Sequence, residues 1–132
     1  MRRQFQLPEE DEAHLDARVQ PWETITERNT QWLLVHDFSV PEGFTEQSVS
    51  VAVAITPGYP VAPLDMAYFH PPVARSDGRP IGALSSHTLD GKTWQRWSRH
   101  RTGQNPWRPG VDDIAGHLAL AEHWLQRELE PR

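Results

Sequence analysis

The sequence predicts an α+β fold built as a single domain, and three observations support that prediction. The chain of 132 residues is 37% hydrophobic, which suffices for one core but is too short for two. Segments typical of strands follow one another between residues 23 and 69, and helical spacing is clearest near the C-terminus. The order of helix, strands, irregular segment and helix indicates α+β, with residues 1–132 forming one domain.

A short helix is the first predicted element. Residues 9–18 follow a Leu-Pro pair and combine helix-forming residues with an acidic first turn. Their apolar side chains are Ala13, Leu15 and Ala17, so we expect a weakly amphipathic helix.

Three or four strands in succession are predicted next, as an antiparallel meander. We expect residues 23–28 and 31–38 to form a hairpin around Asn29-Thr30, because aromatic and branched side chains dominate the second segment. Residues 49–55 alternate large apolar with small side chains in a period of two, the clearest strand pattern in the chain. A Pro-Gly-Tyr-Pro segment then interrupts pairing, because proline donates no amide hydrogen, and residues 65–69 form the fourth strand.

The following segment, residues 71–109, shows little periodicity and contains many prolines, glycines and tryptophans. Long irregular segments in small domains are usually functional or disordered. The large rings of Trp94, Trp97 and Trp107 need burial, which favours order. We therefore expect an ordered, irregular and functional segment here.

A final helix is predicted after this segment. Asp112 is expected to cap it, because aspartate accepts hydrogen bonds from the free amides of a first turn. This helix should pack on the sheet through apolar residues that recur at three- and four-residue steps: Ile114, Leu118, Ala121, Leu125 and Leu129.

The composition excludes several classes of function. Without cysteine there is no disulfide framework, no thiolate metal cage and no thioester chemistry. The net charge of -5 argues against nucleic acid as a partner, because nucleic-acid-binding surfaces usually carry a basic excess. The longest apolar stretch, residues 49–55, is far shorter than the about 20 residues of a membrane span. We therefore expect a cytoplasmic protein that binds neither nucleic acid nor membrane.

A basic patch interrupts this acidic chain, since Arg96, Arg99, Arg101 and Arg108 lie close together among tryptophans. The patch can hold a carboxylate or an acidic partner. Alternatively, the arginines pair with acidic groups of the same fold, and the sequence leaves both interpretations open.

Two motifs resemble landmarks of the ubiquitin-conjugating enzymes. The segment Pro57-Gly-Tyr-Pro-Val-Ala-Pro63, between two predicted strands, resembles that family's tyrosine-proline-x-x-proline turn. The segment Trp107-Arg-Pro-Gly-Val-Asp-Asp-Ile114 resembles its tryptophan-x-proline segment, which follows the active site and leads into a helix. In that family the active-site cysteine lies about eight residues before this tryptophan. The same distance before Trp107 falls in the run Arg96-Trp-Ser-Arg-His100, and Ser98 is within one residue of the expected place.

The chain as a whole resembles a bacterial branch of this superfamily, found in operons with an activating enzyme, ubiquitin-like proteins and a peptidase. The Trp-Ser-Arg-His run is a signature of that branch. The resemblance implies a ubiquitin-conjugating-enzyme-like fold, with the N-terminal and C-terminal helices flanking the meander. The chain departs from the eukaryotic pattern because it lacks the cysteine and the histidine-proline-asparagine motif. His70 lies 28 residues before Ser98, whereas His87 lies 11 before it and fits the family's spacing better.

The resemblance implies an acyl carrier, which receives a ubiquitin-like protein from an activating enzyme as an oxyester on Ser98 and transfers it to an amine. A serine hydroxyl is hardly ionised at neutral pH, so a base is required, and His100 and His87 are the candidates. Arg99, Arg101, His87 or backbone amides are candidates for stabilising the oxyanion, and we expect the amides with one cation.

Other interpretations remain open. Ser98 can instead tie down a loop, and Ser85 and Ser86 are second-ranked nucleophiles. The alternative function is a catalytically inactive adaptor that binds a ubiquitin-like protein or the activating enzyme. A zinc hydrolase is the third, but His117 and His123 are six residues apart, which does not match helical ligand spacing. We therefore predict no metal and no cofactor; the target protein cannot be read from the sequence.

Overall fold

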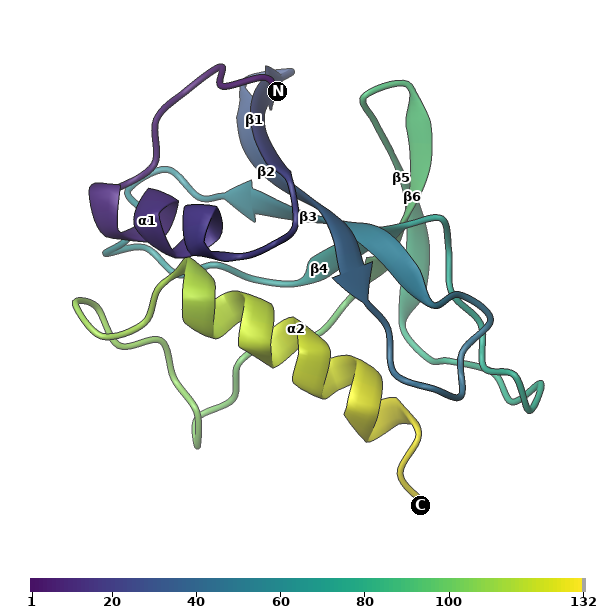
Figure 1. The fold of residues 1–132 in the computed structure, drawn as a ribbon. Coiled ribbons are helices and arrows are strands. Elements are labelled where there is room, and N and C mark those ends of the chain that lie inside the picture. Colours follow the sequence, from purple (N-terminus) through teal and green to yellow (C-terminus); the bar gives the residue numbers. More distant parts are fainter. Residues whose placement is uncertain (132) are drawn as a thin grey trace.

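The computed structural model describes residues 1–131, which form two helices and six strands (Figure 1). In chain order, the elements are α1 (Glu9–Ala17), β1 (Trp22–Glu27), β2 (Thr30–Ser39), β3 (Ser48–Ile55), β4 (Ala67–His70), β5 (Leu84–Leu89), β6 (Lys92–Trp97) and α2 (Ile114–Glu128). Neither helix has the length and apolar character that a membrane span requires. The predicted order of a first helix, a series of strands and a last helix is confirmed.

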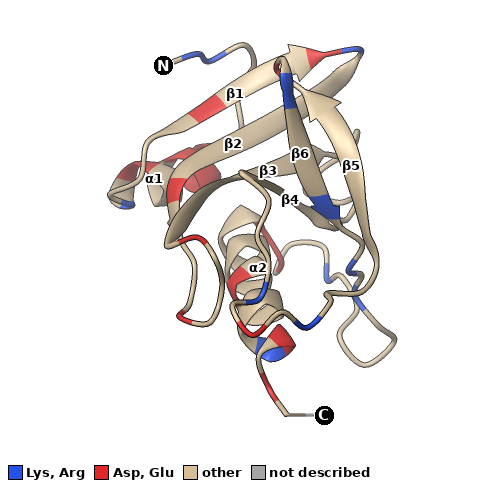
Figure 2. Cartoon of the chain, turned by 90° about the vertical axis from the view of Figure 1, so that its right-hand side faces the viewer, with Lys and Arg blue, Asp and Glu red and all other residues tan. Residues whose placement is uncertain are grey.

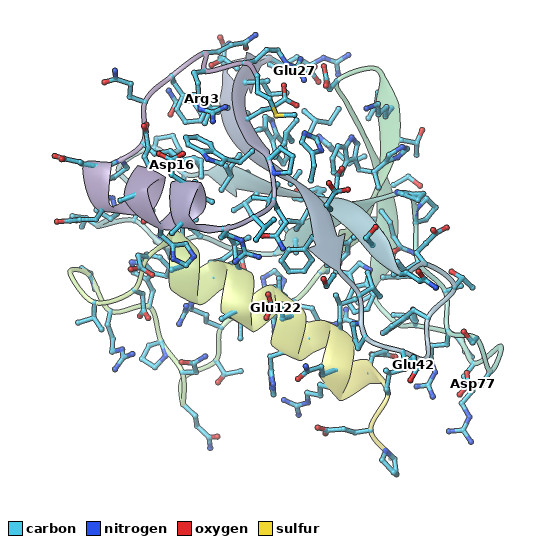
Figure 3. The ribbon with its side chains drawn as sticks, viewed as in Figure 1. Arg3, Asp16, Glu27, Glu42, Asp77 and Glu122 are labelled. Carbon is cyan, nitrogen blue, oxygen red and sulfur yellow. The ribbon has the colours of Figure 1, made fainter. Side chains whose placement is uncertain are left out.

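The strands form one sheet in the order β1-β2-β3-β4-β6-β5, and each neighbouring pair is antiparallel. Both helices cover the same face of the sheet (Figure 1). Side chains fill the space between α2 and the sheet (Figure 3), and the main core lies there, with contributions from β1, β2, β3, β4 and β6. The α+β prediction is confirmed, including the C-terminal helix packed on the sheet.

The prediction that residues 71–109 are irregular throughout is wrong. Strands β5 and β6 form a hairpin within this segment, around a two-residue turn in which Asp90 and Gly91 have φ of 54° and 72°. Positive φ at both positions suits a tight hairpin turn. The residues of β5, Leu-Ser-Ser-His-Thr-Leu, show no strand periodicity, because few of them on either face are apolar. The sheet is a meander only as far as β4, since β6 lies between β4 and β5.

A smaller apolar cluster lies on the opposite face of the sheet from the helices, and the hairpin contributes to it. Trp94 of β6 and Leu89 at the end of β5 are buried there. The remaining members come from the other strands: Ile25, Trp32, Leu34, Ala52 and Tyr68. Burial of the Trp94 ring here, and of Trp97 in the main core, gives both tryptophans a packing role.

The cap of α2 is Asp113 and not the predicted Asp112. The Asp113 side chain accepts a hydrogen bond from the amide of Gly116 at 2.9 Å. Asp112 instead accepts one from the amide of Arg108 at 2.6 Å, inside the preceding turn. Two adjacent aspartates offer the same acceptor, so sequence alone cannot separate them.

The tyrosine of the Pro57–Pro63 turn joins this turn to both helices. The Tyr59 hydroxyl donates to Asp11 of α1 at 2.8 Å and accepts from the Ile114 amide at the start of α2 at 2.9 Å. Burial raises the pKa of Tyr59, and it also raises the pKa of the Asp11 carboxyl, although the hydrogen bond from Tyr59 opposes that second effect. Trp107 adds a third link, because its indole donates to the Pro60 carbonyl at 3.0 Å.

Candidate functional site

Ser98 directly follows β6, where the hairpin ends. Its amide donates to the Ala83 carbonyl at 3.0 Å, which extends the hairpin by one pair beyond Leu84, the first residue of β5, and Trp97, the last residue of β6. The Arg99 amide donates to the Trp97 carbonyl at 2.9 Å, so the chain makes a tight turn centred on Ser98. Ser98 is partly exposed, and within residues 1–131 its hydroxyl makes no hydrogen bond. This hydroxyl does not tie down a loop.

His100, two residues further on, forms a pair with a carboxylate. Its Nδ1 lies 2.9 and 2.8 Å from the two carboxylate oxygens of Asp65. A carboxylate on Nδ1 favours the tautomer protonated there and leaves Nε2 as the basic nitrogen. The His100 side chain is 59% exposed, so this nitrogen is accessible. Sequence reasoning missed Asp65, because 35 positions separate it from His100 and no motif connects them.

The backbone next to Asp65 is fixed by residues from two other segments. The Met66 amide donates to the Arg99 carbonyl at 3.2 Å, and the Met66 carbonyl lies 2.7 Å from Nε2 of His117 on α2. Met66 has a positive φ of 58°, which turns the chain sharply before β4. Burial lowers the pKa of His117, so its neutral imidazole donates to the carbonyl. Hydrogen bonds with Arg99 and His117 therefore hold the backbone next to the imidazole–carboxylate pair in place.

The two arginines predicted to stabilise charge are engaged within the fold. Arg99 donates to the carbonyls of Gly82 and Ser98 at 3.0 and 3.3 Å, and its guanidinium lies 3.5 Å from the Glu128 carboxylate. Arg101 lies 3.7 Å from the Asp112 carboxylate. Each guanidinium also stacks on a tryptophan ring, at 4.9 and 5.0 Å from the ring centroid. For these two residues the interpretation of arginines paired inside the fold is the better one.

Asp112 forms ion pairs with both Arg101 and Arg108, the two arginines of the patch that lie furthest after β6. Arg108 lies 3.5 Å from it, on the same carboxylate oxygen that faces Arg101. Burial acts to raise the pKa of Asp112, but the amide and guanidinium of Arg108 and the charge of Arg101 outweigh it, and the pKa lies below its usual range. This carboxylate therefore stays ionised and holds the loop before α2.

Arg96 differs from the other three arginines of the patch. Among residues 1–131, no carboxylate lies within ion-pair distance of its guanidinium, whose Nε donates to the Ser85 hydroxyl at 2.8 Å. Arg96 lies two residues before Ser98 at the end of β6. Basic residues (blue) occur on β6 and in the loops around its end in Figure 2. Arg96 is the cation of the patch whose charge remains available to a ligand.

His87, the second candidate base, lies away from Ser98. It pairs with Trp94 across the hairpin, four residues before Ser98, a separation of about 13 Å along a strand. Its ring packs against Trp32 and Tyr68, with centroids 5.3 Å from each. The structure gives His87 a place in the aromatic cluster, and a base role for it requires a large movement.

The second-ranked nucleophiles lie on β5. The hydroxyl of Ser85 already accepts the hydrogen bond from Arg96, and Ser86 pairs with Gln95 across the hairpin. Within residues 1–131, neither serine has a histidine hydrogen-bonded to it. Ser98 remains the first candidate because its hydroxyl is unpaired and His100 is close in the chain.

A cleft of about 480 Å³ opens beside His100, between the end of the hairpin and the end of α2. Its walls carry both basic and acidic side chains, so an incoming polar group can reach His100 from this side. The lining residues are Arg99, His100, Trp124, Arg127, Glu128, Glu130 and Pro131.

The described part of the chain contains no group of three or more histidine, cysteine, aspartate or glutamate side chains arranged to hold a metal ion. His117 is buried with its Nε2 on a carbonyl, while His123 on the same helix is exposed. The two do not face a shared site.

A first helix, an antiparallel sheet, a turn that joins both helices and a last helix define an α+β protein of the ubiquitin-conjugating type, here with serine in the candidate site. The family model described as Prokaryotic E2 family E matches residues 7–128, and the chain belongs to that family. The comparisons found no match among curated proteins or among solved structures. The family connects the protein to ubiquitin-like conjugation and, in general terms, to a ubiquitin-like protein and an activating enzyme as partners.

Proposed function

We propose that the protein carries a ubiquitin-like protein as an oxygen ester on Ser98 and passes it to an amine. The observation that supports this most strongly is the unpaired, partly exposed Ser98 hydroxyl, two residues from an imidazole that a carboxylate orients. A nucleophile, a base and a third group that orients the base are the elements of hydroxyl activation. Family membership suggests that the acyl group is the C-terminus of a ubiquitin-like protein, since it connects the chain to ubiquitin-like conjugation.

In the first step, the Ser98 oxygen attacks the activated C-terminal carbonyl that the activating enzyme presents. A carbon–oxygen bond forms, the bond to the leaving group of the activating enzyme breaks, and the proton of the hydroxyl passes to Nε2 of His100. Asp65, on Nδ1, stabilises the imidazolium that forms. His100 and Ser98 share no hydrogen bond in this structure, and such bonds often tighten only when the substrate is bound.

In the second step, an amine attacks the ester carbonyl. The carbon–nitrogen bond forms and the ester carbon–oxygen bond breaks. His100, neutral again after giving the first proton to the departing group of the activating enzyme, removes a proton from the amine and delivers it to the Ser98 oxygen. An oxygen ester is less reactive toward amines than a thioester, so the developing oxyanion needs strong stabilisation. Arg96 suits this role best, because it is the arginine of the patch with no carboxylate within ion-pair distance among residues 1–131.

The test combines the protein with ATP, a cognate activating enzyme and the mature ubiquitin-like protein, followed by a denaturing gel. We expect an adduct that resists thiol reductant and is cleaved by mild base. Ser98→Ala should abolish it, whereas the matched variant Ser85→Ala should retain it. An adduct that persists in Ser98→Ala, or none with the native protein, contradicts the proposal.

A second candidate function is the inactive adaptor. Two observations favour it: the engagement of Arg99 and Arg101 within the fold, and the missing hydrogen bond between Ser98 and His100. An adaptor binds the ubiquitin-like protein with the same affinity in the native form and in Ser98→Ala, and forms no adduct in either. Binding measured in parallel with the gel separates the two functions.

A further inference from the structure

The two edges of the sheet differ in how they are covered. At the β1 edge the N-terminal segment pairs in parallel with the strand: Gln4 donates to the Thr24 carbonyl at 2.9 Å, and the Thr24 amide donates to Arg2 at 3.1 Å. At the other edge, β5 pairs with β6 alone, and within residues 1–131 nothing pairs with its outer side. Figure 2 shows β5 at this margin of the sheet. The β5 edge is therefore open.

The hydrogen-bond pattern of the hairpin identifies which backbone groups are free. Ser98 donates to Ala83, so this pair is hydrogen-bonded, and antiparallel pairs alternate between bonded and non-bonded. The residues of β5 in non-bonded pairs are Leu84, Ser86 and Thr88. Their amides and carbonyls point away from β6, where they can bind a further strand.

The open edge lacks the features that usually block strand addition. Strand β5 contains no proline and no lysine, and its register with β6 is unbroken from Leu84 to Leu89. Edges of natural sheets commonly carry a charge, a proline or a bulge to prevent pairing with another chain. Ser85, Ser86 and Thr88 are exposed, so no side chain of the fold covers the edge.

The direction of β5 connects this edge to the candidate site. The strand runs away from the Ala83–Ser98 pair, so a peptide that adds in the antiparallel sense runs toward that pair. The C-terminal carboxyl of such a peptide then emerges at the end of the hairpin that carries Ser98, next to Ala83 and two strand spacings, or about 10 Å, from β6. Arg96, whose guanidinium bonds to Ser85 at this same end, complements the negative charge of a free carboxylate.

A hollow of about 250 Å³ runs along the hairpin next to this edge. In strand addition the main chain supplies affinity, while alternate side chains of the peptide enter pockets. The hollow can receive one such side chain. It is lined by Pro72, Leu84, Ser85, Ser86, Thr93, Trp94 and Gln95.

We propose that the β5 edge binds the extended C-terminal tail of the ubiquitin-like protein as an added antiparallel strand, which directs the terminal carboxyl toward the end of the hairpin where Ser98 lies. This inference rests on the proposed function for the identity of its ligand. It assigns to the hairpin the task of directing the tail, a task independent of whether the serine is then acylated.

The probe is a synthetic peptide of the last ten or so residues of the ubiquitin-like protein that forms the adduct, or of its nearest candidate where none forms, with a free C-terminal carboxylate. Ser86→Pro removes an amide that points outward and leaves the bonds between β5 and β6 intact, because proline is tolerated at such edge positions. We expect this variant to bind the peptide about tenfold more weakly, and Ser86→Ala, which keeps the amide, to bind within about twofold of the native protein.

A second measurement does not depend on the folding of a variant. In the native protein, amide hydrogen exchange at Leu84, Ser86 and Thr88 should slow when the peptide is added, while exchange at Thr26 on the opposite edge should not change. Absence of this protection, or equal binding by Ser86→Pro, overturns the inference.

The two proposals fail in distinguishable ways. If the native protein forms the serine adduct but the β5 amides gain no protection, the edge inference is wrong and the acyl-carrier function stands. If the amides gain protection but no adduct forms, strand addition stands and the inactive adaptor replaces the acyl carrier.

Discussion

Two groups of serine, histidine and carboxylate side chains occur in this protein, and they differ in how completely they are connected. The first group consists of Glu23 on β1, His36 on β2 and Ser50 on β3, and these three strands are neighbours in the sheet. His36 Nδ1 is 2.7 Å from the Ser50 hydroxyl, and its Nε2 is 2.7 Å from the Glu23 carboxylate. Arg2 adds a further ion pair to Glu23 at 2.9 Å. Every member of this group has a partner.

The second group, Ser98, His100 and Asp65, has one connection missing, and we call it the open group. The first group, Glu23, His36 and Ser50, is the closed group. His100 is paired with Asp65, but the serine hydroxyl is free among residues 1–131. Strand pairing places the first group at fixed separations, whereas the second lies on turns at the ends of β6 and before β4. The comparison teaches that strand pairing can hold a serine, a histidine and a carboxylate in a complete set, whereas the turn that carries Ser98 leaves its hydroxyl unpaired. A complete set is also what an activated serine requires, so we assign the first group a structural role because it lies away from the position after β6 that the resemblance identifies.

The largest effect is expected for the base of the open group. His100→Ala should slow formation of the adduct about 100-fold or more, because general-base catalysis contributes at least that factor. The stability of the fold should hardly change, since the side chain is 59% exposed. Single-turnover kinetics with the activating enzyme measures the rate, and thermal unfolding provides the control. A rate equal to that of the native protein would assign the base elsewhere.

The closed group should respond in the opposite way. Glu23→Ala leaves the Arg2 guanidinium and the His36 imidazole without their shared carboxylate, so we expect a loss of about 2 kcal/mol in the free energy of unfolding. The rate of adduct formation should stay within about twofold of the native rate, because the group takes no part in the chemistry. Urea unfolding measures the first quantity. Inactivation by Glu23→Ala at unchanged stability contradicts this division of roles.

The closed group also predicts a pH dependence. The hydrogen bond from Arg2 is the main cause that lowers the pKa of Glu23 to about 2, against the opposing effect of burial. Because the pKa is lower in the folded state, the stabilisation is complete above the ordinary glutamate pKa and is lost as the pH falls toward about 2. The unfolding temperature measured from pH 5 to pH 2 should fall more steeply for the native protein than for Glu23→Gln. Parallel curves contradict the prediction.

A smaller effect is expected when Asp65, the residue that orients His100 in the open group, is changed. Asp65→Asn keeps a side chain of the same shape but cannot stabilise an imidazolium, so adduct formation should slow, though less than in His100→Ala, while the ester linkage still forms on Ser98. A pH–rate profile identical in shape and height to that of the native protein would show that Asp65 positions nothing.

The parts of the fold that could be predicted from sequence are those with one buried face. The alternation in Val49–Ile55 and the spacing of Ile114, Leu118, Ala121 and Leu125 reflect burial against each other in the main core. Strand β5 carries no such pattern, because it lies at an edge and its side chains are largely polar. The hairpin therefore escaped prediction although Asp90-Gly91 is a common turn sequence.

The candidate site could be predicted in its position along the chain but not in its connections. Ser98 and His100 follow from the resemblance, whereas Asp65 joins them only through the corner at Met66, which Arg99 and His117 hold from distant segments. Nor could sequence assign the arginines, because ion pairing depends on which carboxylates the fold brings near. Such contacts between distant segments carry no local sequence signal.

The smallest effect is expected for the serine of the closed group. Ser50→Ala removes one acceptor or donor for His36 and should cost about 1 kcal/mol of stability or less, because the imidazole keeps Glu23 as its partner. It should form the serine adduct at the native rate, in contrast to Ser98→Ala. Mass mapping of the base-labile adduct in both variants therefore provides a direct comparison of two serines in the same fold. If the ester is found on Ser50, complete hydrogen bonding marks the reactive hydroxyl, and the assignment of the two groups must be reversed.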